Sequence, residues 1–343
     1  MNIDYIKSKI KNKEEIPLIE TAFNFASTKL LGINYSKDET LINHILGIIN
    51  TLIDFNADST TLISCLLYET INNGISKEEI EKQFGTEISN IAFSSSIINT
   101  KKLIQDDKKQ LDYLEQLNVD SPEDVRTLFI KLADRLYSMN TQERLETGYQ
   151  KKVAEETLEI LVPTAQRLRL NYIKSKLEDL CLLYLEPQAY NEILNKLNAT
   201  PEILSNQLNE TKNNISDLLN NNNINFVIKG RVKNIYSIYN KLMSGKSWDE
   251  IYDILALRII LDDESECNKV LELIHSNYMY LYERFKDYIN NPKENMYQSF
   301  HTTIIHNNRF YEIQIRTNEM HKTAEVGNAS HQLYKQKQLN IKR

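Results

Sequence analysis

The sequence KGRVKNIYSIYNKL (229–242) opens a stretch of mixed helix and strand patterns that ends with RFYEIQIR (309–316). Between them lie YDILALRII (252–260), RFKDYI (284–289) and PKENMYQSFHT (292–302). Basic side chains, aromatic rings and two carboxylates recur in these segments, and a site that grips polyphosphates and a base needs such groups. Helical patterns fill the chain before this stretch, so the stretch decides that the fold is not all-helical.

The periodicity of this stretch predicts an α+β domain beside an all-α one. Residues 254–261 are apolar and rich in β-branched side chains, which predicts a buried strand. Asn307 and Asn308 separate two strand-like segments, and Asn tolerates the positive φ of a two-residue hairpin turn. We therefore expect strands at 224–229, 254–261, 299–306 and 309–316, and helices at 235–243, 265–276 and from 318 onward.

The first 196 residues have helical patterns throughout. Ser76 and Ser121 are predicted N-caps, the first in a capping box with Glu79 and the second followed by Pro122. An apolar stripe in the helix after Ser121 leaves Asp134 on the opposite side, which favours a solvated carboxylate. The asparagines at 220–223 are expected to interrupt the helical pattern with a loop.

The composition restricts the class of protein. The 343-residue chain carries a net charge of −6, which argues against a general nucleic-acid binder, whereas residues 229–343 hold 17 Lys and Arg against 14 Asp and Glu. Cys65, Cys181 and Cys267 are widely spaced, which favours buried thiols in a reducing compartment. No run has the length of a membrane span. We expect a cytoplasmic protein that takes small anionic ligands, with no stable binding of nucleic acid or membranes.

Two carboxylates in the C-terminal stretch are candidate metal ligands. Asp253 begins the predicted buried strand, and Glu312 alternates with Gln314 and Arg316 on one face of the last strand. Mg²⁺ prefers hard oxygen ligands, commonly one or two carboxylates together with phosphates. The alternatives are that Asp253 caps a turn and that Glu312 lies on an ordinary exposed strand face.

Hydrogen-bond donors for phosphates cluster around these acids. Lys233, Ser237 and Lys241 have the i, i+4, i+8 spacing of one helix face. No G-x-x-x-x-G-K-[ST] motif is present, so a P-loop is excluded. Tyr297 is positioned to stack on a base or to anchor its loop. Further donors are predicted at Arg231, Arg284, Lys286, Lys293 and His301.

These segments together resemble the synthetase domain of the Rel-type long alarmone synthetase/hydrolase family. The matching segments are KGRVKNIYSIYNKL, SWDEIYDILALRII, RFKDYINNPKENMYQSFHTT and EIQIRTNEMHKTAEVG, in that order. KQFGTEI, IKLADRL, ETLEILVPTAQRL and KLEDL are similar to the hydrolase domain and connecting helices of the same family. The resemblance implies transfer of pyrophosphate from ATP to the 3′-hydroxyl of GTP or GDP, giving pppGpp or ppGpp.

The resemblance also implies residue roles. Asp253 and Glu312 are similar to the Mg²⁺-binding catalytic pair, with Glu312 as a candidate base. The residues that would bind ATP are Arg231, Lys233, Ser237, Lys241 and Arg258. The residues that would bind the guanosine nucleotide are Lys293, Tyr297, His301 and Gln314. The chain departs from the family pattern at Asn234, where a His is usual, and at Gln332, where a Trp is usual.

The N-terminal part departs further from the family. His44 and Asp134 match hydrolase metal ligands, but Tyr68-Glu69 replaces a His-Asp pair, and Asn72-Asn73 replaces an acidic pair. Tyr35 and Ser138 replace an Arg and an Asn. Neutral amides cannot act as a general base, so the resemblance predicts a degenerate hydrolase site.

The predicted organisation has an HD-type pseudo-hydrolase domain at 1–150, connecting helices at 151–200, and a nucleotidyltransferase-like synthetase domain with a mixed sheet at 201–343. The predicted activity is that of a Mg²⁺-dependent GTP pyrophosphokinase. Three alternatives remain: a bifunctional enzyme whose Glu69 supports weak hydrolysis, a non-catalytic nucleotide-binding regulator, and a toxin-like enzyme that modifies RNA 3′ ends.

Overall fold

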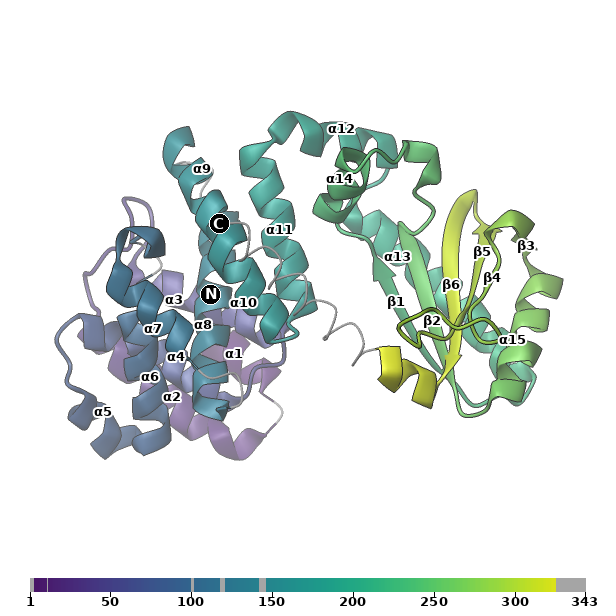
Figure 1. Ribbon diagram of the computed structural model, residues 1–343. Coiled ribbons are helices and arrows are strands. Elements are labelled where there is room, and N and C mark those ends of the chain that lie inside the picture. Colours follow the sequence, from purple (N-terminus) through teal and green to yellow (C-terminus); the bar gives the residue numbers. More distant parts are fainter. Residues whose placement is uncertain (1–2, 11, 100–101, 118–120, 142–145, 325–343) are drawn as a thin grey trace. The chain divides into compact units, whose positions relative to one another are not determined.

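The computed structural model describes residues 3–10, 12–99, 102–117, 121–141 and 146–324 (Figure 1). The chain divides into two compact units, Met1–Pro187 and Gln188–Arg343. The first unit is helical, and the second combines helices with a six-stranded sheet. The predicted class, a helical domain followed by a mixed-sheet domain, is confirmed. None of the described helices combines the length and the apolar character that crossing a membrane requires.

The N-terminal unit is built from helices whose ends follow local sequence signals. Ser76 accepts a hydrogen bond from the backbone N–H of Glu79, and Ser121 accepts one from Asp124 with Pro122 at the first helical position, so both predicted N-caps are confirmed. The helices are α1 Ile3–Lys9, α2 Ile16–Lys29, α3 Leu41–Asp54, α4 Ser59–Asn72, α5 Lys77–Phe84, α6 Thr86–Ile97, α7 Lys108–Gln116, α8 Pro122–Asn140, α9 Thr147–Glu156, α10 Val162–Arg167 and α11 Asn171–Leu185.

Helix α8 lies at the centre of the N-terminal unit. Asp134 is part of this helix and is buried, so the prediction that it is solvated is wrong. One apolar cluster surrounds α2, α3, α4 and α6, a second joins α8 to α9 and α11, and side chains of α8 belong to both. The helix is therefore buried on nearly every side, and Asp134 is only 2% exposed. Its neighbour Arg135 is also buried and pairs with Glu156 of α9. Burial of a charged pair is tolerated because each group has an opposite charge and hydrogen bonds.

The helices of the C-terminal unit are α12 Pro187–Leu197, whose first residue belongs to the other unit, α13 Pro201–Asn221, α14 Ile235–Met243 and α15 Glu264–Asn277. Two short 3₁₀ helices are η5 Trp248–Glu250 and η6 Tyr282–Arg284. Its strands are β1 Val227–Val232, β2 Leu255–Leu261, β3 Met279–Tyr280, β4 Lys286–Asp287, β5 Phe300–His306 and β6 Arg309–Thr317. The sheet order is β1-β2-β6-β5-β3, with β4 paired to β5. Only the β2–β6 pairing among these strands is parallel.

Several predicted elements of this unit are confirmed. The turn residues Asn307 and Asn308 have φ values of 47° and 57°, as a two-residue hairpin requires. The first strand lies later than predicted, at Val227–Val232, because α13 continues through Asn221. The expected asparagine loop is thus wrong at its start: Asn222 is the helix C-cap, and Asn223 takes the positive φ that ends the helix. All three cysteines are buried free thiols.

Helices cover one face of the sheet. Leu255, Leu257 and Ile259 of β2 point to this face together with Tyr311, Ile313 and Ile315 of β6, and these six side chains are buried. Helices α13 and α15 pack here, as their side-by-side placement with the sheet in Figure 1 shows. The alternate residues of both strands must point to the other face, which α13 and α15 do not cover. The polar residues predicted for the site lie there.

Candidate active site

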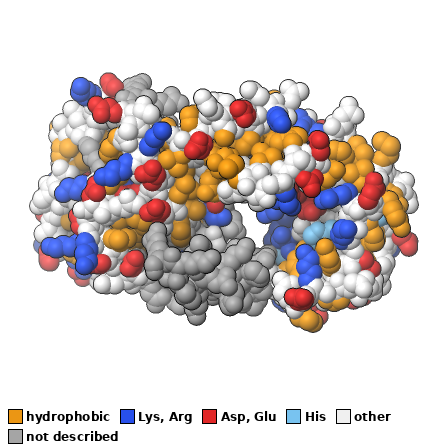
Figure 2. Space-filling model, turned by 45° about the horizontal axis from the view of Figure 1, so that its top comes forward, with side chains coloured by type: hydrophobic (Ala, Val, Ile, Leu, Met, Phe, Trp, Pro, Cys, Tyr) orange, Lys and Arg blue, Asp and Glu red, His pale blue; other side chains and the backbone are white. Residues whose placement is uncertain are grey.

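The strand register aligns polar side chains from five strands on the second face of the sheet. Glu312 of β6 pairs with Ala256 of β2 and Thr303 of β5, and the next residue on the same face, Gln314, pairs with Arg258 and His301. Paired residues point to the same face of a sheet. The row continues with Arg231 opposite Ala256, Lys286 opposite His301, and Arg316 at the end of β6. In Figure 2, Lys and Arg side chains of this unit gather around a His.

Asp253 lies just before β2 and is held by two lysines. Lys233 Nζ donates to Oδ2 at 2.9 Å, and Lys241 Nζ lies 2.9 Å from Oδ1 and 2.8 Å from Oδ2. Burial raises the pKa of Asp253, but the hydrogen bonds from Lys241 and Lys233 outweigh it and lower the pKa to about 2. The carboxylate is therefore ionised at neutral pH. It does not act as a cap in the described contacts.

The lysines reach Asp253 in a different way from that predicted. Helix α14 begins at Ile235 with Asn234 as N-cap, so Lys233 precedes the helix and cannot share a helix face with Lys241. The two ammonium groups converge because Asp253 lies between them. Burial lowers the pKa of Lys233, and Asp253 opposes that effect. Ser237 lies in the first turn of α14, half-buried.

Glu312 belongs to a short chain of polar contacts. Gln314 Nε2 donates to Glu312 Oε2 at 3.0 Å, and His301 Nδ1 lies 3.6 Å from Oε1. The other ring nitrogen of His301 is 2.8 Å from the Tyr297 hydroxyl. Burial raises the pKa of Glu312, but the contacts with His301 and Gln314 together outweigh it, so the carboxyl pKa falls below its ordinary value. This acid too is ionised at neutral pH.

Aromatic rings and cations surround His301. The Tyr288 ring centroid is 5.3 Å from that of His301 and 6.2 Å from that of Tyr297. Lys293 Nζ lies 4.4 Å from the Tyr288 ring and 5.3 Å from the Tyr297 ring. The Arg316 guanidinium lies 5.8 Å from the Tyr297 ring. Cations over aromatic faces leave a surface that suits a base and its phosphates.

Sequence reasoning omitted Tyr288 from the site. The sequence signal that could have identified Tyr288 is its position in RFKDYI, the segment that precedes Lys293 and Tyr297 in the chain. Arg284 of the same motif lies elsewhere: its guanidinium is 4.3 Å from the ring of Tyr252. The added donor predicted at Arg284 therefore packs on an aromatic ring, whereas Lys286 joins the polar row.

Asp253 and Glu312 suit a divalent cation whose other ligands come from a nucleotide. Asp253 and Glu312 are both ionised, and the Asp253 charge contributes to the pKa of Glu312, so the two carboxylates are close enough to interact. No cluster of three or more His, Cys, Asp or Glu side chains suited to a metal occurs in the described part of the chain. Two carboxylates suit Mg²⁺, which takes its remaining ligands from phosphates and water.

In the N-terminal unit, the surviving hydrolase-like residues contact each other directly. His44 is 1% exposed, and its Nε2 lies 3.2 Å from Asp134 Oδ1 while Nδ1 lies 3.4 Å from Glu39 Oε2. Tyr68 donates its hydroxyl to Asp134 Oδ2 at 3.4 Å, and Tyr35 stacks on the His44 ring at 3.5 Å. Tyr68 and Tyr35 thus contact Asp134 and His44 directly.

The C-terminal end of α4 and the turn of α8 after Asp134 hold the remaining members of this site. Asn72 Nδ2 donates to Glu69 Oε2 at 3.2 Å, and Asn73 Nδ2 donates to the Glu69 carbonyl at 2.8 Å. Both amides are exposed. Ser138 donates to Asp134 Oδ1 at 3.3 Å, and its Oγ lies 3.3 Å from the Tyr35 hydroxyl. No carboxylate stands at the positions of the two amides to activate water.

Comparisons with known proteins fit both units. Residues 230–339 match the region found in RelA/SpoT proteins, and residues 22–170 match an HD domain. A GTP pyrophosphokinase of Myxococcus xanthus is 33% identical over 328 residues, which is 94% of this chain and 43% of that protein. A guanosine-3′,5′-bis(diphosphate) 3′-pyrophosphohydrolase of Spiroplasma citri is 34% identical over 337 residues, 96% of this chain and 45% of that protein.

The chain thus spans less than half the length of these curated relatives. Among solved structures, small alarmone synthetase 2 of Bacillus subtilis is 31% identical and covers 44% of this chain and 81% of its own, with a TM-score of 0.34. Small alarmone synthetase 1 of the same organism, bound to its product pppGpp, is 22% identical with a TM-score of 0.34, over 38% of this chain and 77% of its own.

Proposed function

The chain belongs to the RelA/SpoT family, and we propose that its C-terminal unit transfers pyrophosphate from ATP to the 3′-hydroxyl of GTP or GDP. The observation that carries this proposal is the polar sheet face. It offers two ionised acids, Asp253 and Glu312, each in contact with basic or donor groups, beside a cluster of tyrosines and cations. Pyrophosphoryl transfer depends on alignment and charge neutralisation more than on covalent catalysis by the protein.

ATP would bind beside α14. Lys233 and Lys241 point their ammonium groups at one location, and Arg231 and Arg258 lie in the neighbouring row of the sheet. These cations would hold the triphosphate, and Ser237 in the first turn of α14 would add a hydroxyl donor. The lysines would exchange part of their contact with Asp253 for phosphate oxygens.

The guanosine nucleotide would bind beside Tyr297. Its base would stack on that ring, with Lys293 near its phosphates and with Gln314 and His301 as hydrogen-bonding groups. This arrangement brings the acceptor 3′-hydroxyl toward Glu312, which adjoins both His301 and Gln314. An ionised carboxylate can accept the proton of that hydroxyl as it attacks the β-phosphorus of ATP, which breaks the bond to the α–β bridging oxygen and releases AMP.

We propose that Asp253 and Glu312 hold Mg²⁺ when the nucleotides are bound. The ion would neutralise charge on the phosphate oxygens during transfer. The protein side chains would keep the two acids ionised and would orient them: Lys233 and Lys241 for Asp253, and Gln314 for Glu312. The contact of Gln314 with Glu312 exists before a nucleotide arrives, so this acid needs little reorganisation for the reaction.

We further propose that the HD-type unit does not hydrolyse the product. His44 and Asp134 contact each other and the tyrosines that surround them, and amides occupy the positions from which an acid would activate water. A catalytic divalent site usually retains at least three protein ligands and an open position. Glu69 is the remaining acid of this turn, and its Oε2 accepts a hydrogen bond from Asn72.

Incubation of the protein with ATP, Mg²⁺ and labelled GTP, followed by nucleotide separation, tests the proposed function. Formation of labelled pppGpp is the expected result. A matched reaction with Glu312→Gln should form none above the no-enzyme control. Binding of both nucleotides without any product would instead support the non-catalytic regulator.

A further inference from the structure

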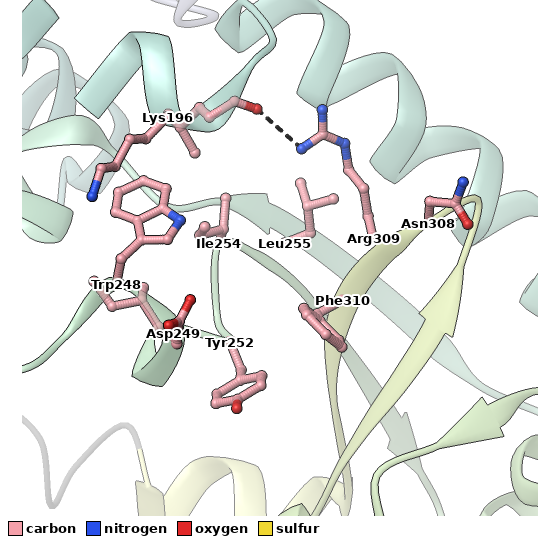
Figure 3. A pocket seen from close by; sticks show the side chains of 11 residues that line it. Lys196, Trp248, Asp249, Tyr252, Ile254, Leu255, Asn308, Arg309 and Phe310 are labelled. Atoms are coloured by element: carbon pink, nitrogen blue, oxygen red, sulfur yellow. Dashed lines mark hydrogen bonds between the residues drawn. The ribbon is translucent and has the colours of Figure 1, made fainter. Parts of the chain in front are cut away.

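A pocket lies at one end of the sheet, and its lining residues are not those of the polar row. Its cavity measures about 350 Å³, within the range of small-ligand sites. Residues from α12, η5, the start of β2 and the β5–β6 turn line it (Figure 3). Three aromatic rings form much of its wall: Trp248, Tyr252 and Phe310.

The pocket borders the candidate active site, because Phe310 lies two residues before Glu312 on the same face of β6. Tyr252 and Ile254 line the pocket, whereas Asp253 between them does not and is held by Lys233 and Lys241. The pocket is therefore not a part of the metal-binding pair, although it lies against the same segment.

The aromatic wall is open to a ligand. Phe310 is 44% exposed and meets Tyr252 edge to face, with ring centroids 5.3 Å apart. The Arg284 guanidinium lies over the Tyr252 ring, 4.3 Å from its centroid. Held aromatic rings around a cavity of this size favour a planar ring as the ligand, because stacking needs little further ordering of the protein.

Charged groups border the pocket on two sides. Lys196 and Arg309 lie along the upper side in Figure 3, and Asp249 lies along the lower side with Tyr252 and Phe310. Lys196 Nζ is 5.6 Å from the Trp248 ring, and Arg309 Nη1 donates to the Leu197 carbonyl at 3.2 Å. Among the residues that the structure describes, neither cation has a carboxylate within ion-pair distance.

We propose that this pocket binds a nucleoside monophosphate whose base carries an amino group. The base would enter between Trp248 and Phe310, the phosphate would meet Lys196 and Arg309, and the amino group would donate to Asp249. Two cations suit one phosphate, and Arg309 retains further N–H donors beyond the one that it directs at Leu197. The bound nucleotide would then contact the segment that carries Asp253.

Trp248 makes this binding directly observable, because it is the chain's single tryptophan. Titration of the full chain with AMP should quench its fluorescence saturably, since a stacked base contacts the indole ring. Adenosine lacks the phosphate, ribose 5-phosphate lacks the base, and IMP lacks the amino group. Each of these three probes should require at least tenfold higher concentrations than AMP.

Two variants separate this pocket from the candidate active site. Lys196→Glu changes an exposed side chain and should weaken AMP quenching at least tenfold while leaving the melting temperature unchanged. Arg231→Ala, on the polar sheet face where ATP is proposed to bind, should leave AMP quenching as it is. The proposal is overturned if AMP gives no saturable quenching, if Lys196→Glu binds AMP like the parent, or if Arg231→Ala abolishes the signal. The readout requires no pyrophosphate transfer, so it stands or fails independently of the proposed function.

Discussion

Replacement of Asp253 by Asn removes one charge from the candidate active site with little change in shape. The pKa of this carboxyl is about 2 against an ordinary value of 3.8, and each pKa unit corresponds to about 1.36 kcal/mol. The fold therefore stabilises the ionised form by roughly 2 kcal/mol, a stabilisation that the neutral amide cannot receive. Lys233, whose side chain is 10% exposed, would lose its anionic partner.

Two measurements follow from this reasoning. The free energy of unfolding of Asp253→Asn, from urea titration at neutral pH, should fall by about 2 kcal/mol or less, because the amide oxygen still accepts hydrogen bonds. The rate of labelled pppGpp formation should fall on the order of 100-fold or more, the usual loss when a preorganised electrostatic group is removed. Added Mg²⁺ should not restore the rate.

Asp263→Asn is the matched control. Asp263 follows the other end of β2, is exposed, and makes no side-chain cap hydrogen bond to α15. Both the synthesis rate and the stability of this variant should match those of the parent. Turnover of Asp253→Asn within threefold of the parent would refute the assignment, as would an equal loss in Asp263→Asn.

Three further predictions concern the guanosine site, the HD-type unit and a helix cap. Tyr297→Ala should raise the KM for GTP much more than that for ATP, because base–aromatic stacking contributes about 1–3 kcal/mol; equal changes in steady-state kinetics would make Tyr297 a loop anchor. In the presence of Mn²⁺, the unmodified protein should not degrade ppGpp faster than the no-enzyme control. A variant that restores the family pattern should hydrolyse ppGpp if only the site was lost. This variant combines Tyr35→Arg, Tyr68→His, Glu69→Asp, Asn72→Glu, Asn73→Asp and Ser138→Asn. Asp58→Ala should cost about 1–2 kcal/mol of unfolding free energy, since Asp58 caps α4 through Thr61 and accepts two hydrogen bonds from Arg126. Burial raises the pKa of Asp58, but the hydrogen bonds from Arg126 and Thr61 outweigh burial and lower the pKa below its ordinary value. The stabilisation is therefore present above the ordinary carboxyl pKa and is lost as pH falls through the lowered pKa. An acid denaturation curve that is the same for Asp58→Ala and the parent would contradict this prediction.

Local signals predicted the elements of the fold where one residue type determines the backbone. Asn307-Asn308 specified a tight turn, and Ser121-Pro122 specified a helix start, and both are found. The pattern failed where tertiary packing decided the outcome. An apolar stripe predicted one buried face for α8, yet the helix is enclosed on nearly every side, and Asp134 is buried through contacts with distant residues.

For the candidate site, sequence order identified the participating segments but not their geometry. Lys233 and Lys241 were expected to share a helix face, and they meet instead at Asp253 from two different elements. Tyr288 was missed because its contacts with Tyr297 and His301 depend on how the loop folds back. The roles proposed for these residues remain predictions that the experiments above can test.

The parallel pairing of β2 with β6 sets the order in which the site can form during synthesis of the chain. Glu312 comes to lie on the strand beside Asp253 only after the hairpin of β5 and β6 has been made and has docked against β2. Closure of such a long loop carries an entropic cost that a local contact does not. A nascent chain that has been synthesised only as far as α15 therefore has Asp253 and its two lysines but lacks Glu312. The two acids can come together only after the last strand has left the exit tunnel.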